Sequence, residues 1–233
     1  MPFSVHGSSS RRVRFACATG ILLVAGGAIA DQRSEHQLRQ TFNEIYDKGA
    51  WAKGADGKGT SGVGSTLEIT REYRAYLEAF IKSHEIKSIV DAGSGDWEFS
   101  SAVDWNHAHY LGVDISNTVV GAVKRKYESD LVKFQVGDVT ESLPRADLLI
   151  CKDVLQHLSF AQVRKFIKNN LKKGKYKWAI ITNDRGAENR DIKAGDFRPI
   201  NLSAPPFGVK KLVDLPVTFD GQPEKIVELL DLR

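Results

Sequence analysis

Cysteine is scarce in this chain, which has two in 233 residues, Cys17 and Cys151. Cys17 falls in an N-terminal stretch with the pattern of a leader, and Cys151 falls in an apolar run that predicts a buried strand. A chain cut after the leader therefore has no pair of cysteines for an internal disulfide. Cysteine usage does not identify the compartment in which the protein works.

Beyond residue 30 the chain also lacks an excess of charge of either sign. The formal net charge is +4, but residues 1–30 contain three arginines and no acidic residue, so the remainder is close to neutral. Residues 164–177 hold seven basic side chains and no acid. Their lysines alternate with a helical apolar face, and no aromatic stacking pattern accompanies them. These features predict a solvated helix surface and no nucleic-acid partner.

Residues 1–30 have the composition of a leader. A basic segment at 11–14 precedes an apolar stretch at 16–30, which ends in the small-residue pattern Ala28-Ile-Ala30. The stretch is too short and too rich in glycine to predict a membrane span. Two interpretations stay open: a leader for export or anchoring, or an over-extended start with translation beginning further in.

The segment Ser88-Ile-Val-Asp-Ala-Gly-Ser-Gly-Asp-Trp97 carries the most information. Its β-branched run ends in an acid and a Gly-x-Gly turn, which is typical of a buried strand that leads into a nucleotide-binding loop. Glycine is needed there because the backbone turns with positive φ and approaches a ligand that a Cβ would block.

Three more apolar runs along the chain also end in an acid, at Asp114, Asp138 and Asp153. Ligands of parallel α/β sheets bind at the carboxyl ends of the strands. Asp114 is placed to accept hydrogen bonds from the hydroxyls of a ribose, and Asp138 to meet an adenine edge. A lone Asp at such a position can be a helix N-cap, but four acids at four strand ends favour a binding site.

With these motifs the chain resembles the class I S-adenosylmethionine (SAM)-dependent methyltransferases, over roughly residues 66–184. The resemblance rests on Asp91-x-Gly93-x-Gly95, Gly-Val-Asp114-Ile, Gly137-Asp138 and Asp153-Val-Leu-x-His157-Leu. It implies SAM as the cofactor. The cofactor-binding residues that it implies are Asp91, Gly93, Gly95, Trp97, Asp114, Ile115, Asp138, Val139, Lys152 and Asp153.

The loop departs from the family at one point, because Asp96-Trp97 stands where many members place a third glycine. A dinucleotide site is the weaker interpretation. Glu98 occupies the last position of a Gly-x-Gly-x-x-Gly pattern, and the chain has no Tyr-x-x-x-Lys pair for proton transfer.

Alternating strands and helices predict an α/β fold with right-handed crossovers. We expect a Rossmann-like three-layer sandwich whose mostly parallel seven-stranded sheet ends in an antiparallel pair, Leu212–Leu215 and Lys225–Leu232. Helix starts are predicted at three sites: the capping-box pattern Ser65-Thr-Leu-Glu68, Ser116, and Ser159-x-x-Gln162. The fifth strand is predicted over Tyr176–Thr182.

The expected organisation is a leader (1–30), an N-terminal helix with a glycine-rich lid (31–65) and a methyltransferase domain (66–233). The helix is predicted over residues 35–47. The glycine-rich segment, Lys48–Ser65, is interpreted as a lid over the cofactor or as a linker. A loop after the fifth strand is either an acceptor-binding flap, with Arg198, Asn201 and Phe207 as contacts, or a structured connection.

Asp153 and His157 are the candidate catalytic residues. They stand four apart, so on a helical turn they share a face, and an imidazole suits removal of a proton from a hydroxyl or amine acceptor. The alternative is that Asp153 caps the segment and His157 packs against it. Trp97 is either an aromatic face against the sulfonium or a core tryptophan.

The sequence thus predicts a SAM-dependent methyltransferase acting on an O or N atom of a small or medium-sized acceptor. The alternatives are a non-catalytic SAM- or nucleotide-binding module of the same fold, and an exported binding protein. No metal site is predicted, nor a stable membrane span beyond the possible leader. The cofactor argues for the cytoplasm and residues 1–30 argue for export or anchoring, so localisation and oligomeric state stay open.

Overall fold

The computed structural model describes residues 19–51, 60–210, 212–219, 221–222 and 224–233, with side chains from residue 34 onward. The chain divides into two units, Met1–His36 and Gln37–Arg233. Helix α1, Thr19–Lys48, contributes residues to both. The predicted leader lies outside the described residues up to residue 18, and it stays a prediction. No helix in the described part of the chain is both long and apolar enough to cross a membrane.

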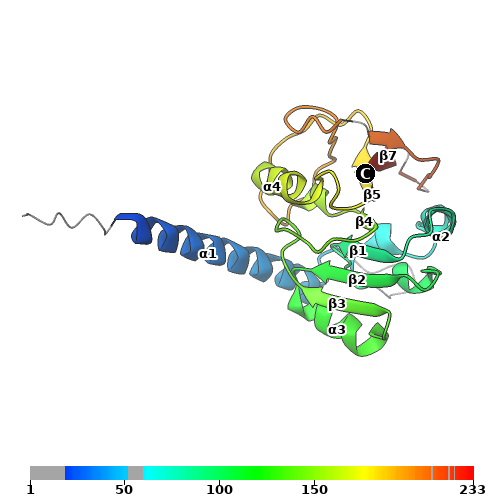
Figure 1. The fold of residues 1–233 in the computed structure, drawn as a ribbon, viewed down its shortest axis with the longest axis horizontal. Helices are drawn as coiled ribbons and strands as arrows, with labels where there is room; N and C mark the ends of the chain where they lie inside the picture. Colours follow the sequence, from blue (N-terminus) through cyan, green and yellow to red (C-terminus); the bar gives the residue numbers. More distant parts are fainter. Residues whose placement is uncertain (1–18, 52–59, 211, 220, 223) are drawn as a thin grey trace, which may run out of the picture. The chain divides into compact units, whose positions relative to one another are not determined.

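A seven-stranded sheet forms the centre of the unit Gln37–Arg233, in the order β3-β2-β1-β4-β5-β7-β6 (Figure 1). β1 to β5 run parallel, and β7 pairs antiparallel with both β5 and β6. The predicted Rossmann-like sheet with an antiparallel C-terminal pair is therefore confirmed. The strands are β1 (Ser88–Ala92), β2 (His109–Asp114), β3 (Val132–Val136), β4 (Leu148–Cys151), β5 (Trp178–Asp184), β6 (Leu212–Asp214) and β7 (Lys225–Asp231).

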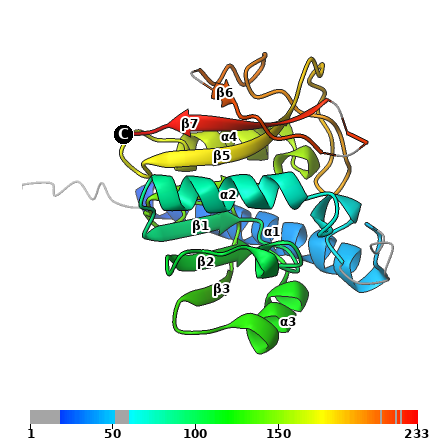
Figure 2. The ribbon, with the colours of Figure 1, turned by 90° about the vertical axis from the view of Figure 1, so that its right-hand side faces the viewer.

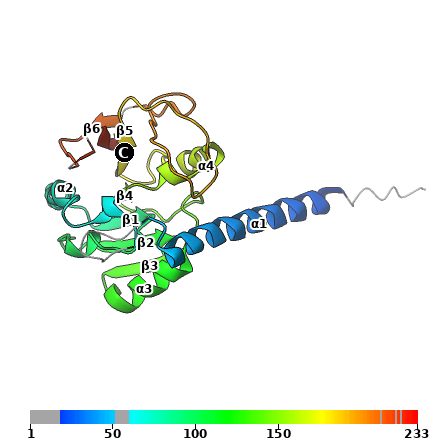
Figure 3. The ribbon, with the colours of Figure 1, turned by 180° about the vertical axis from the view of Figure 1, so that it is seen from behind.

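Helices cover both faces of the sheet, because its central strands are apolar on both sides. Helix α2 (Arg71–Ser83) packs in one cluster with Leu148 and Ile150 of β4, and α4 (Phe160–Asn170) packs in another with Leu149. The two helices lie on opposite sides of the sheet in Figures 1 and 3, and α2 crosses in front of it in Figure 2. Helix α3 (Asn117–Tyr127) joins the α2 cluster.

Two of the three predicted helix starts are confirmed by their caps. The Ser116 hydroxyl accepts a hydrogen bond from the Val119 amide at the start of α3. At α4 the Ser159 hydroxyl accepts from the Gln162 amide, and the Gln162 side chain accepts from the Ser159 amide at 2.9 Å, which completes a capping box. Local hydrogen bonding thus determines where both helices begin.

The N-terminal helix, predicted over residues 35–47, is longer and spans Thr19–Lys48 as α1. Two further predicted boundaries are wrong. Helix α2 begins at Arg71 rather than beside Ser65, because Ser65 ends a separate 3-10 turn and its hydroxyl donates to the carbonyl of Ser61. Strand β5 begins at Trp178 rather than Tyr176, since its register is determined by pairing with β4 and β7. In both cases the boundary depends on contacts that the local sequence pattern does not contain: a turn that precedes α2, and the strands that pair with β5.

The capping box of α4 can be tested with Ser159→Ala. Loss of the cap leaves the Gln162 amide without its acceptor, so we expect the free energy of unfolding to fall by about 1 kcal/mol. Urea unfolding at neutral pH measures this loss. The exposed Ser203, which lies outside the helices, serves as the control, and Ser203→Ala is expected to stay within about 0.5 kcal/mol of the wild type. Equal stability of the two variants would contradict the capping role.

Candidate active site

A cavity of about 520 Å³ lies beside the segments that follow β1, β2, β3 and β4. Its volume falls within the range of about 300–1,000 Å³ that small-molecule sites occupy. All ten predicted cofactor-binding residues, and His157, line it. Further lining comes from Phe42, Tyr46, Trp51, Ser61, Gly62, Val63, Gly64, Gly195, Phe197, Gln222 and Lys225. The parallel sheet thus gathers the predicted site residues around one volume.

The turn after β1 needs glycine at two positions. Gly93 and Gly95 have φ of 83° and 55°. A Cβ on Gly93 would lie 2.3 Å from a methyl carbon of Val154, and one on Gly95 would lie 2.4 Å from the Ser61 hydroxyl oxygen. Any larger residue would push apart the walls of the cavity.

Asp114, at the end of β2, is bound by this turn. Its carboxylate accepts hydrogen bonds from the amides of Gly95 (3.1 Å) and Ser116 (2.9 Å). Burial raises the pKa of Asp114 to about 6, against the lowering effect of these two amides. The carboxylate therefore lies in the cavity wall in a fixed orientation, and its remaining lone pairs can accept from a ligand.

Asp91, in β1, has a different environment. The Tyr110 hydroxyl donates to it at 2.5 Å, and burial raises the pKa of Asp91 to about 6. The residue is 3 % exposed and lines the cavity. A buried carboxylate with one donor keeps acceptor capacity for a cationic ligand group.

Ile115 and Val139 give the cavity an apolar part, and both are buried. Asp138 lies next to Val139 and accepts a hydrogen bond from the Thr140 amide at 2.8 Å. Two aliphatic side chains beside an acceptor match the flat apolar faces and polar edge of a nucleobase.

Trp97 lines the cavity but belongs mainly to the core. Its ring lies 4.9 Å from Tyr127, 5.4 Å from Phe134 and 5.6 Å from Tyr110, measured between centroids. Only 7 % of the residue is exposed. This environment favours the core interpretation of Trp97, whose φ is 58°.

The segment before α2 lies directly on the glycine turn. The Asp96 carboxylate accepts from the Ser61 amide at 3.0 Å and also from the Thr60 amide, while the Asp96 amide donates to the Ser61 hydroxyl at 2.9 Å. Tyr46 of α1 approaches the same hydroxyl at 3.4 Å. The predicted lid region therefore contacts the cavity at its described end, and residues 52–59 of that region lie outside the described residues.

Asp153, after β4, lies between two lysines. Lys152 Nζ is 2.6 Å from one of its carboxylate oxygens and Lys225 Nζ is 3.0 Å from the other. The two ammonium groups hold the pKa of Asp153 well below its usual range despite burial, whereas burial lowers the pKa of Lys152. A carboxylate stabilised in this way is a poor proton acceptor.

Asp153 and His157 do not lie on one helical turn, as their spacing had suggested. Asp153 precedes the 3-10 helix η3 (Leu155–His157) and has φ of 55°, and its carboxylate is bound by the lysines. His157 Nδ1 lies 3.0 Å from the carbonyl oxygen of Asp196. A carbonyl only accepts, so Nδ1 carries the proton and the Nε2 lone pair is left for another group.

Burial lowers the pKa of His157 below its ordinary value of 6.5, so the ring is neutral at pH 7. Its centroid lies 4.9 Å from that of Trp51 and 5.5 Å from that of Phe197. The three rings come from three separate parts of the chain and form an aromatic row along the cavity.

A buried arginine holds the segment that carries His157. Arg198 is 0 % exposed and donates to the carbonyls of Leu155 (2.6 Å) and Leu158 (2.9 Å). The Gly195 amide donates to the carbonyl of His157 at 2.9 Å. The loop 195–198 therefore orients His157 through the backbone.

The flap contacts expected at Arg198, Asn201 and Phe207 are wrong, because none of the three lines the cavity. Arg198 binds carbonyls, the Asn201 side chain accepts from the Ser203 amide, and Phe207 packs on Phe160 with ring centroids 5.1 Å apart. The same loop does reach the cavity, through Gly195 and Phe197.

Residues 90–176 match the family model described as a methyltransferase domain. This chain contains a class I SAM-dependent methyltransferase domain. No curated protein matches the chain significantly.

Solved structures support the fold of the methyltransferase domain. The N-methyltransferase NodS from Bradyrhizobium japonicum WM9, in complex with S-adenosyl-L-homocysteine, is 15 % identical with a TM-score of 0.57, covering 81 % of this chain and 98 % of its own. Magnesium protoporphyrin IX methyltransferase from Synechocystis PCC 6803, with bound SAM, is 16 % identical with a TM-score of 0.56, covering 84 % and 95 %. The methyltransferase domain of a bacterial CtHen1 is 14 % identical with a TM-score of 0.56, covering 70 % and 98 %. At these identities the likeness is one of fold.

Several cavity residues of the methyltransferase domain escaped the sequence analysis, among them Lys225, Gln222 and Phe197. Lys225 begins β7, more than 70 residues after Asp153, and no motif joins them. The position of Lys225 at the start of the last predicted strand could have indicated it, because this end of the strand lies at the same edge of the sheet as the cavity. The structure describes no cluster of three or more His, Cys, Asp or Glu side chains able to hold a metal ion.

The raised pKa of Asp114 predicts how stability changes with pH in the absence of a ligand. Folding raises this pKa from 3.8 to about 6, so between these two pH values the folded protein binds more protons than the unfolded protein. The protonated carboxyl group therefore contributes stability at low pH, and that contribution is lost as the pH rises through 6. The shift corresponds to about 3 kcal/mol. Asp114→Asn is expected to remove this part of the decline, as urea unfolding at pH 4, 5, 6 and 7 will measure.

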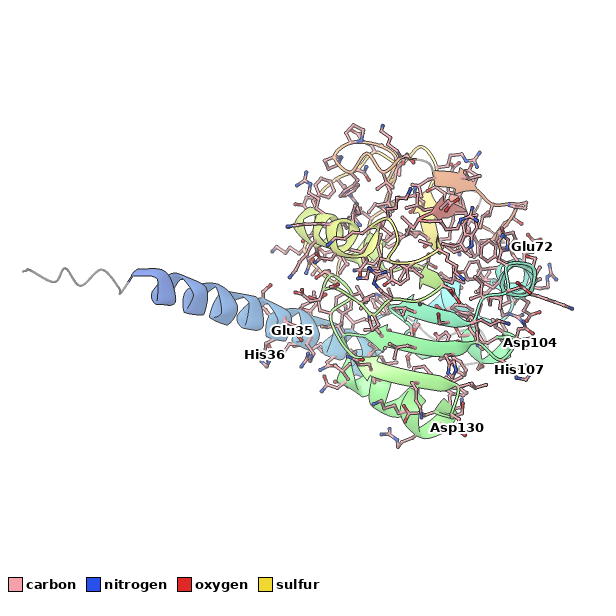
Figure 4. The ribbon with its side chains drawn as sticks, viewed as in Figure 1. Glu35, His36, Glu72, Asp104, His107 and Asp130 are labelled. Carbon is pink, nitrogen blue, oxygen red and sulfur yellow. The ribbon has the colours of Figure 1, made fainter. Side chains whose placement is uncertain are left out.

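The control is Asp130→Asn, which changes an exposed residue in the turn between α3 and β3 (Figure 4). It is expected to keep the pH dependence of the wild type. An unchanged decline in Asp114→Asn would contradict the assignment of a buried, destabilising charge to Asp114.

Proposed function

We propose that the methyltransferase domain binds SAM along the cavity from Asp138 to Asp153 and methylates an O or N atom of a small or medium-sized acceptor. The observation that carries this proposal is the Gly93–Gly95 turn, whose amide holds the buried carboxylate of Asp114 at the cavity wall. That arrangement offers a close backbone approach and an oriented acceptor for a ribose in one place.

The residues present fit the parts of SAM. Ile115 and Val139 would contact the adenine, with Asp138 at its polar edge, and Asp114 would accept from the ribose hydroxyls. Asp91, with Gly93 and Gly95, would hold the methionine part, whose ammonium needs an acceptor. The cradle has no room for a Cβ at Gly93 or Gly95, which supports a ligand lying close to the backbone.

SAM supplies a methyl group on a positively charged sulfur that leaves as a neutral thioether. The protein must hold the acceptor in line and take up its proton. We assign the proton to His157 Nε2, because Nδ1 already donates to the Asp196 carbonyl and the ring is neutral at pH 7. Asp153 is placed in a positioning role, holding Lys152 and Lys225 beside the acceptor.

The segment Thr60–Ser65 is proposed to cover the cofactor. Its hydrogen bonds to Asp96 hold Ser61 against Gly95, and the residues from Ser61 to Ser65 line the cavity. A wall held by a few exchangeable hydrogen bonds can open for a ligand and shield the reaction from water when closed.

Calorimetric titration of the full chain with SAM and with S-adenosylhomocysteine tests cofactor binding. We expect micromolar affinity for both ligands, lost by at least about tenfold in Asp114→Ala because the ribose acceptor is gone. Asp130→Ala is the matched control and should bind as the wild type does. A folded wild-type protein that binds neither ligand would contradict the proposed function, whereas binding without turnover on any acceptor would favour a non-catalytic module.

The role of His157 is tested by its ionisation. In ¹⁵N-histidine NMR spectra of the full chain, we expect a neutral ring protonated on Nδ1 with a pKa below 6.5, assigned by its absence in His157→Gln. With an acceptor that turns over, His157→Gln should lower kcat by about 10²–10⁴-fold and remove the acid limb of the pH profile. His109→Gln, an exposed change at the start of β2, should alter neither. An Nε2-protonated ring would overturn this assignment.

A further inference from the structure

The cation cluster at one end of the cavity is formed by Lys152, Asp153 and Lys225, and it carries two positive charges for one negative charge. All three residues line the cavity. The side chain of Lys152 is 3 % exposed and that of Lys225 is 15 % exposed. Asp91 acts on Lys152 and Asp184 acts on Lys225 as more distant negative charges. Among the described residues, however, the salt bridges of both lysines go to the one carboxylate of Asp153, and a buried charge is costly unless close partners compensate it.

The two lysines are not equivalent. Lys152 Nζ binds Asp153 at 2.6 Å and the Gly64 carbonyl at 2.8 Å, and it lies 5.3 Å from the ring centroid of Phe99. Lys225 Nζ has Asp153, at 3.0 Å, as its polar partner among the described residues. An ammonium group has three donors, so Lys225 keeps capacity for an anionic ligand in the cavity that it lines.

Lys225 approaches from the side of the sheet away from the cofactor-binding strands. It begins β7, and β4 and β5 separate β7 from β1 in the sheet (Figure 1). With neighbouring strands about 4.8 Å apart, β7 lies roughly 14 Å from β1. The proposed cofactor path ends at Asp153, and Lys225 reaches Asp153 from the β7 side of the sheet, so an anion on Lys225 is assigned to the acceptor.

The wall next to this cluster is aromatic. Trp51, His157 and Phe197 form the aromatic row, and Phe197 is 61 % exposed although it lines the cavity. Phe197 contacts the His157 ring on one side, and the rest of its large apolar surface is left uncovered beside the cavity. A planar ring packed against it would bury that surface and gain offset or edge contacts.

We propose that the acceptor is a small aromatic carboxylate bearing a hydroxyl or amino group. Its carboxylate binds Lys225, its ring packs against Trp51 and Phe197, and its hydroxyl or amino group faces His157 Nε2. This assignment rests on the proposed function and names the substrate class of the same site. A carboxylate bound to Lys225 could also come from the methionine part of the cofactor, and the experiment distinguishes the two.

The experiment uses the full chain saturated with S-adenosylhomocysteine. The probes are the 2-, 3- and 4-hydroxybenzoates and aminobenzoates, each compared with its neutral amide by calorimetric titration. At least one acid is expected to bind about tenfold or more tightly than its amide, because the amide cannot form the ion pair. The matching cyclohexane carboxylate should bind more weakly than the aromatic acid.

Three variants separate the sources of this preference. Lys225→Met keeps roughly the length of the side chain and removes its charge, so this variant should bind each acid and its amide equally well. Its affinity for S-adenosylhomocysteine should change less than about twofold. Lys225→Arg should retain the preference for the acid, which excludes a general loss of structure. Lys133→Met, an exposed change in β3, should behave as the wild type.

Each contrary result has its own meaning. Equal binding of every acid and its amide by the loaded wild type, or a preference that survives in Lys225→Met, would overturn the acceptor assignment and leave the proposed function standing. A loss of S-adenosylhomocysteine affinity in Lys225→Met would assign the lysine to the cofactor and also overturn it. No binding of S-adenosylhomocysteine to the wild type would contradict the proposed function, and the acceptor assignment with it.

Discussion

The parallel pairing of β1 with β2 and β4 brings three turns of the chain to one edge of the sheet. Asp114 then lies within hydrogen-bond distance of the Gly95 amide, and Val154 packs against Gly93 so closely that no Cβ fits between them. The cavity exists because these turns meet. Strand ends and turns of this edge supply much of its wall, and Phe42 and Tyr46 of α1 add to it.

The domain maintains this cavity at a cost in stability. Burial raises the pKa values of Asp91 and Asp114 to about 6, so at neutral pH both carboxylates are ionised in an environment that disfavours charge. At the opposite end of the cavity, two lysines share the carboxylate of Asp153 as their salt-bridge partner. A ligand with hydroxyl and ammonium donors at one end and an anion at the other compensates both, which is the sense in which the site is complementary to its substrates.

Local patterns predicted the elements well and the contacts between them less well. The caps of α3 and α4 and the acids at the strand ends involve residues a few positions apart, and the structure confirms where they lie. The start of α2 was wrong because Ser65 belongs to a turn that packs on the glycine loop. Arg198 was a candidate acceptor contact in the sequence. In the structure its side chain is buried and donates to the carbonyl of Leu155 in η3, because buried carbonyl groups need hydrogen-bond donors.

By itself, the sequence determined the order of strands and helices, the glycine turn and the acids that follow each strand, since apolar periodicity, turn chemistry and caps act over short distances. Only the tertiary structure decided which charges meet. Asp153 forms a salt bridge with Lys225, and His157 donates its Nδ1 proton to the carbonyl of Asp196. These pairs join residues that lie up to about 70 positions apart, and the packing of the sheet and its loops, rather than any local pattern, brings them together.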